Sequence, residues 1–171
     1  DVARMRDIFM NNFSQVCKSV FFSNELAMIH GDSQVIRLIM QQQPPFVIND
    51  HRLGIITCEK KKKNFNLVER QLFAGTLVYL GPGTIINPIC FSEDFELIGI
   101  GLFADFPMPF ATGAFPSAFN GQVRDFQMPA STEDQQTARN ILETRWHLIH
   151  QTNYHRPTAS SLIAALMHHY D

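Results

Sequence analysis

The stretch GTLVYLGPGTIINP, residues 75–88, decides the fold of this 171-residue chain. TLVYL at 76–80 predicts a strand, because β-branched and aromatic side chains favour the extended backbone. The GPG sequence at 81–83 predicts a turn, and TIINPICF at 84–91 predicts the next strand. The stretch therefore indicates a β-rich domain in which consecutive short strands are joined by tight turns.

Short apolar segments flank this stretch on both sides. Further strands are expected at 52–59, 65–69, 70–74 and 95–103. Short strands at regular intervals with turn signals are typical of a sandwich or a barrel, and we predict a barrel over residues 46–106. The run Lys60 to Lys63 could contact DNA phosphates or an acidic partner. We interpret it as a solvated hairpin tip, because lysines there discourage edge pairing.

The two ends of the chain show helical patterns. Apolar spacing predicts a helix within 3–20 and helical turns at 33–41, with a strand at 26–30 between them. Two amphipathic stripes near the carboxyl end predict an αα-hairpin. The expected organisation is a single regulatory domain with an N-terminal arm at 1–45, the barrel at 46–106, an irregular connector at 107–130 and the hairpin at 131–171.

Composition narrows the functional classes. Fourteen Lys and Arg against 16 Asp and Glu give a net charge of −2, which argues against this chain alone binding nucleic acid through a basic face. Cys17, Cys58 and Cys90 are widely spaced, so we expect a reducing compartment, the cytoplasm. No apolar run reaches membrane-spanning length. The 15 phenylalanines indicate a thick apolar interior or an apolar cavity.

The β-rich region has too few histidines for a metal site. Only His30 and His51 precede the helical tail, whereas an open metal site needs about three protein ligands. Two histidine pairs in the tail could share a metal, but solvated or interface side chains are the simpler interpretation; they are His147 with His150 and His168 with His169. We therefore expect no metal and no cofactor.

Catalytic motifs are also absent from the sequence. There is no G-x-S-x-G elbow, and the GPG turn at 81–83 lacks the Lys-Ser/Thr of a phosphate-binding loop. Tyr79 and His51 are the only candidates for an acid–base pair, and nothing in the sequence pairs them. We therefore do not expect an enzyme.

Several short motifs occur together between residues 33 and 106. They are Phe46 ahead of a strand bearing Arg52, the pair Asn66-Leu67, Gly75-Thr76-Leu77, Pro82-Gly83 and Asp94-Phe95-Glu96. With these motifs the stretch resembles the cupin effector-binding domain of AraC/XylS-family transcription regulators, including divergent members common in Bacteroidetes. The resemblance extends more loosely to the helical hairpin, where that family dimerises.

The resemblance implies a fold that is mainly β with α, namely a cupin-type barrel (double-stranded β-helix or jelly roll) followed by an αα-hairpin. Cupins carry a glycine, five residues, Pro-x-Gly, two residues and a histidine. Here Gly75 begins that frame, Gly81 stands in place of the first proline and Ile86 stands in place of the histidine. Because the histidine would be a metal ligand, the resemblance implies a metal-free barrel.

A ligand pocket and a dimer interface are also implied by the resemblance. The expected pocket residues are Arg52, Ile56, Tyr79, Ile86, Pro88, Ile98 and Ile100. Sugar-sensing members of the family present polar groups at the positions of Pro88, Ile98 and Ile100. An aliphatic wall at these positions would leave sugar hydroxyls without hydrogen-bond partners, at a cost of about 1–3 kcal/mol for each hydroxyl. We therefore expect a small, partly apolar effector. The expected dimerisation residues are Ile141, Leu142, Arg145, Trp146, Ile149, Leu162 and Leu166.

These expectations favour one function and leave two alternatives. The favoured function is the ligand-sensing and dimerisation domain of an AraC-type regulator, a homodimer that contacts DNA only through a C-terminal helix-turn-helix domain absent from this chain, with no membrane partner. The alternatives are a metal-independent cupin enzyme, such as a sugar epimerase or isomerase, and a structural dimerisation module. An apolar cavity would favour the ligand-sensing domain. A polar cavity with converging His and Tyr side chains would favour the enzyme, and a core filled with side chains would favour the structural dimerisation module.

Overall fold

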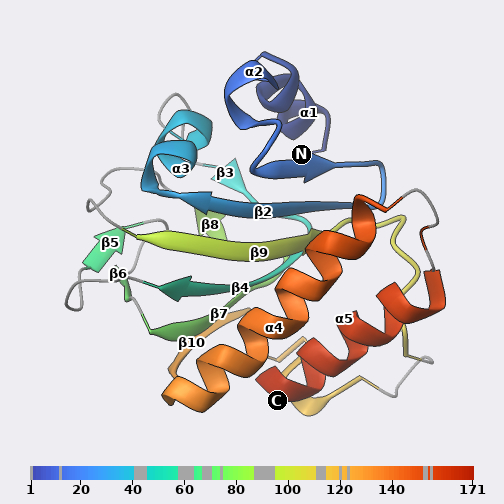
Figure 1. The fold of residues 1–171 in the computed structure, drawn as a ribbon. Coiled ribbons are helices and arrows are strands. Elements are labelled where there is room, and N and C mark those ends of the chain that lie inside the picture. The colour runs from blue at the N-terminus through green and yellow to red at the C-terminus, as the bar shows by residue number, and fades with distance from the viewer. Residues whose placement is uncertain are drawn as a thin grey trace.

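The computed structural model describes residues 2–11, 13–40, 46–57, 64–66, 71–73, 75–86, 95–110, 115–119, 121–122, 124–151, 154 and 156–171. They form a mainly β structure with helices on both sides of a sheet (Figure 1). The helices are α1 (Val2–Asn11), α2 (Phe13–Val16), α3 (Ser33–Met40), α4 (Thr132–Ile149) and α5 (Arg156–Tyr170), with a 3-10 turn η1 at Ser117–Phe119. The strands are β1 (Val20–Phe22), β2 (Leu26–Asp32), β3 (Phe46–Val47), β4 (His51–Thr57), β5 (Asn64–Asn66), β6 (Gln71–Phe73), β7 (Thr76–Leu80), β8 (Ile85–Ile86), β9 (Glu96–Leu102) and β10 (Asp125–Pro129).

A six-stranded antiparallel sheet forms the centre of the molecule. Its strand order is β1-β2-β9-β4-β7-β10, and β3–β8 and β5–β6 form two separate two-stranded ladders. Among the described residues the large sheet ends at β1 and β10, so no closed barrel is seen there. The mainly β fold with helices is confirmed, and the cupin barrel stays a prediction.

The sequence located the central strands and missed two edge strands. β7 coincides with the strand predicted at 76–80, and β4 and β9 overlap the strands predicted at 52–59 and 95–103. β1 begins at Val20, the last residue of the helix expected within 3–20, where the structure has α1 and α2 instead, and β10 lies in the segment expected to be irregular. β1 has only three residues, too few for a clear alternating pattern, and β10 contains Asp125 and Pro129, residue types that are depleted in strands. The sheet therefore extends beyond the range 46–106 predicted for the barrel, into the arm and the connector.

The two predicted helices of the hairpin, α4 and α5, cover one face of the sheet (Figure 1). Alternation along the strands gives this face its large apolar side chains, which pack against the buried residues of α4 and α5. They are Leu26, Met28, Leu53, Ile55, Leu77, Tyr79, Ile98, Ile100 and Leu102 from the sheet, with Ala138, Leu142, Ile163, Leu166, Met167 and Tyr170 from the helices. This cluster is the main core.

The last residue of α5 bonds directly to the middle of the sheet. Tyr170 is 1% exposed, and its hydroxyl donates a hydrogen bond to the Gly54 carbonyl in β4. Burial raises the pKa of the Tyr170 phenol far above its ordinary value, so the hydroxyl keeps its proton and stays a donor. None of the helices among the described residues is long and apolar enough to cross a membrane.

Candidate functional site

An apolar cavity of about 200 Å³ lies on the sheet face opposite α4 and α5. Figure 1 shows α1, α2 and α3 grouped above β2, on the other side of the sheet from the hairpin. These helices and the β3–β8 ladder contribute the roof of the cavity, which includes Ile8, Phe9, Val16, Ile36, Ile39, Phe46 and Ile86. The N-terminal arm thus encloses space above the sheet.

Residues with little or no side chain form the floor of the cavity. Gly54 of β4 pairs directly with Gly99 of β9, and Ala27 of β2 pairs with Gly101. All four line the cavity. A Cβ built on Gly99 would lie 3.1 Å from the Leu53 carbonyl oxygen, which is closer than an ordinary van der Waals contact, so there is little room for even one added carbon. The cavity exists because these positions carry almost no side chain.

One charged residue stands on the cavity wall. Among the described residues that line the cavity, Arg52 is the only ionisable one. Its Nε lies 2.9 Å and its Nη2 3.2 Å from the two carboxylate oxygens of Asp50, whose side chain is 8% exposed. The guanidinium also lies 5.9 Å from the ring centre of Phe46. Because Asp50 balances the charge of Arg52, the wall presents mostly neutral, apolar surface to a ligand.

The predicted pocket residues fall into three groups. Arg52, Ile56, Ile86 and Ile100 line the cavity. Tyr79 and Ile98 belong instead to the core beneath α4 and α5. The last, Pro88, lies outside the described residues. Ligand binding by any of them stays a prediction.

Tyr79 and His51 are brought together on the helix-covered face. The Tyr79 hydroxyl and His51 Nδ1 are hydrogen-bonded at 2.8 Å, and the ring of Phe119 packs edge-on against Tyr79 at 4.8 Å between centres. Burial raises the pKa of Tyr79 to about 12. Burial lowers the pKa of His51, partly opposed by the nearby Asp50 carboxylate. Neither residue lines the cavity, so a ligand held there contacts neither ring.

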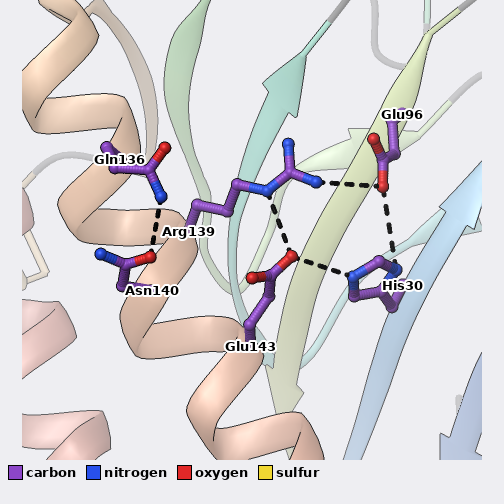
Figure 2. Close-up of polar contacts among 6 residues, drawn as sticks. All are labelled: His30, Glu96, Gln136, Arg139, Asn140 and Glu143. Carbon is purple, nitrogen blue, oxygen red and sulfur yellow. Dashed lines mark hydrogen bonds and ion pairs between the residues drawn. The ribbon is translucent and has the colours of Figure 1, made fainter.

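A polar cluster that the sequence did not single out joins the sheet to α4 (Figure 2). His30 of β2 lies 3.3 Å from the Glu143 carboxylate and 3.8 Å from that of Glu96 in β9. Arg139 of α4 lies 3.6 Å from the Glu96 carboxylate and 3.1 Å from that of Glu143. Partial burial works to raise the pKa of Glu143, but hydrogen bonds with His30 and Arg139 outweigh it and lower that pKa.

Three histidines of the helical tail contact other residues of the chain. His150 Nδ1 lies 2.7 Å from the Trp146 carbonyl, and His169 Nε2 lies 3.0 Å from the Asp134 carbonyl. The ring of His168 packs against Phe110 at 5.3 Å between centres. Within the described ranges, no group of three or more His, Cys, Asp or Glu side chains could hold a metal ion.

The residues expected at a dimer interface are largely used within the chain. Leu142, Arg145 and Leu166 are at most 1% exposed. Ile141, Trp146, Ile149 and Leu162 are half-buried. Amphipathic stripes look the same whether they meet their own sheet or a second copy, so the sequence could not separate the two uses. Dimerisation stays a prediction.

Comparisons with known proteins give similarities to solved structures. No protein-family model matches the chain, and no curated protein matches it. A crystal structure of an apo ToxT variant from Vibrio cholerae strain SCE256 is similar with a TM-score of 0.42 and 9% identity. The match covers 84% of this chain and 53% of that one, so this chain spans about half its length. A similarity of this size carries no argument about function.

The buried His51 should make stability depend on pH. Its folded-state pKa lies below the ordinary value of 6.5, so the unfolded chain binds more protons between the two values. The contribution of the neutral His51 to the free energy of unfolding is therefore fully present above pH 6.5, and it is lost as the pH falls from 6.5 through the lower folded-state pKa. We expect His51→Gln to flatten the fall in unfolding free energy between about pH 7.5 and about pH 5, measured by urea denaturation. The exposed His147→Gln should keep the wild-type profile, and equal slopes in all three proteins would contradict the assignment.

Proposed function

We propose that this protein is the ligand-sensing and dimerisation domain of an AraC-type transcription regulator. The observation that carries the proposal is the apolar cavity between the glycine floor and the N-terminal arm. A structural module would fill this space with side chains, since protein interiors are normally close-packed. The motifs shared with AraC/XylS-family domains support the same function. In this proposal a helix-turn-helix domain outside this sequence binds the DNA. The regulator acts in the cytoplasm.

The proposed effector is a small molecule with substantial apolar surface. The described wall is aliphatic and aromatic apart from Arg52, which Asp50 already engages. A sugar would bury several hydroxyls without partners, at a cost of about 1–3 kcal/mol each. An apolar ligand gains instead from leaving water, by about 25 cal/mol for each Å² buried.

The proposed fold is a cupin-type barrel, and the second core cluster supports it. Seven buried residues pack between the β3–β8 ladder and the face of the large sheet away from α4. They are Ile36, Ile48, Ile56, Val78, Leu80, Ile86 and Phe95. Two layers of antiparallel strands around a shared apolar interior are the arrangement of a jelly roll. Ile86, which stands where cupins carry a metal-binding histidine, is 1% exposed inside this layer.

Two connections can carry a change in the cavity to the hairpin. The first is the hydrogen bond from Tyr170 at the end of α5 to Gly54, which forms part of the cavity floor. The second is the polar cluster of Figure 2, in which His30 of β2 and Glu96 of β9 contact Glu143 and Arg139 of α4, while the same two strands also line the cavity. A ligand that shifts the floor would bias the position of both helices.

We propose no catalytic role. The alternative of a metal-independent enzyme needs an acid–base pair that reaches the substrate, and His51 and Tyr79 are its candidates. These two side chains are hydrogen-bonded to each other on the face covered by the hairpin. Phe119 and Phe126 pack against the tyrosine ring. The pair is thus placed to stabilise the core.

Small apolar probes should bind the cavity and raise the melting temperature. We expect benzene and indole to raise the melting temperature and a pentose to leave it unchanged. A ligand present at about 100 times its Kd adds about 2.7 kcal/mol to the free energy of unfolding. Ala27→Leu should remove the response, because its side chain would enter the cavity. The matched control Ala165→Leu, at an exposed position on α5, should keep it. Stabilisation by the pentose alone would contradict the proposal.

The hairpin should form a homodimer through its half-buried apolar side chains. We expect sedimentation equilibrium to show a dimer, and Leu162→Glu to shift it towards monomer because a charge at an apolar contact must be desolvated. The control Ala104→Glu, at an exposed position after β9, should leave the dimer intact. A strict monomer at high protein concentration would remove dimerisation from the proposed function.

A further inference from the structure

A second pocket lies at the end of the helical hairpin where α4 connects to α5. It has a volume of about 200 Å³ and is bordered by the last turns of α4, the first turns of α5 and the segment after β9. Its walls include Glu25, Phe106, Arg145, Tyr154, Arg156 and Ser160. None of these residues lines the cavity above the sheet, so the two spaces are separate.

Arg145 gives this pocket a buried positive charge that has no salt-bridge partner among the described residues. The residue is 1% exposed, yet its Nε and Nη1 have no hydrogen-bond partner among the residues that the structure describes. Its Nη2 donates to the Tyr154 hydroxyl at 2.6 Å, and the Tyr154 ring centre lies 5.3 Å from the guanidinium carbon. A buried guanidinium without a hydrogen-bonded anion is costly, because burial removes its hydration and one bond to a neutral hydroxyl replaces only part of it. The same burial lowers the pKa of Arg145.

We propose that this pocket binds a small oxyanion, a carboxylate or phosphate group, with Arg145 as its central cation. A guanidinium presents N–H donors in a fixed plane that suits such groups. Arg156 adds a second cation at the rim, where it is 70% exposed, and Ser160 adds a hydroxyl. Both belong to the start of α5, a helix of 15 residues whose N-terminal dipole also favours an anion.

The charges around the pocket favour a singly charged ligand. Glu25 lies 3.6 Å from Arg156 Nη1 and offsets one of the two guanidinium groups. The remaining charge of about +1 suits a monoanion better than a dianion. Phe106 and two prolines, Pro107 and Pro157, leave room for a short apolar group beside the anion. This site goes beyond the proposed effector cavity, and its ligand would brace α4 against α5.

The test compares sodium acetate and sodium phosphate with sodium chloride at equal ionic strength. We expect saturable binding of at least one oxyanion by calorimetry, with a matching rise in melting temperature. Arg145→Met keeps the side-chain volume and removes the charge, and it should weaken binding by at least about tenfold. The control Lys18→Gln removes one positive charge from an exposed residue outside the pocket and should bind as wild type.

The pattern of binding identifies the group. Binding of acetate alone, of phosphate alone or of both would support the site and separate a carboxylate from a phosphate ligand. If Arg145→Met does not fold, Arg156→Gln replaces it, because that exposed side chain is dispensable for the core. Absence of saturable binding above the chloride reference, or wild-type affinity in the Arg145 variant or in its replacement, would overturn the proposal.

Discussion

The direct pairing of Gly54 with Gly99 at the centre of the sheet is the constraint on which the rest of the structure depends. Each glycine leaves so little clearance that a Cβ would lie 3.1 Å from a backbone oxygen of the other strand. Without side chains at these positions the sheet has a bare centre on one face. The N-terminal arm roofs that centre, and the space between them is the cavity.

The two faces of these strands differ in the size of the side chains they carry. Towards α4 and α5, β4 and β9 present branched apolar side chains that form a continuous core. Towards the arm, the alternate positions of these strands include the floor glycines. Tyr170 reaches through the core to the Gly54 carbonyl, so the hairpin is bonded to the cavity floor by one side chain. The proposed sensing function needs such a physical link between the ligand and the surface that responds to it.

The sequence predicted what is local and missed what depends on register. The strand at 76–80 and the two long helices follow from residue patterns within one segment, and the structure confirms them. The contact of His51 with Tyr79 joins residues 28 positions apart, and it follows only once β4 is paired with β7. Likewise, Arg145 sits in an apolar stripe that predicted an interface, whereas the fold buries it beside Tyr154.

The central claim is that dry, apolar space lies above the paired glycines, and xenon tests it most directly. Apolar cavities that exclude water take up xenon under pressure, whereas close-packed interiors do not. Crystals pressurised with xenon should show an atom between Gly99 and the ring of Phe9, both of which line the cavity. Diffraction that shows no xenon there, with side chains or ordered water filling the space, would contradict the claim.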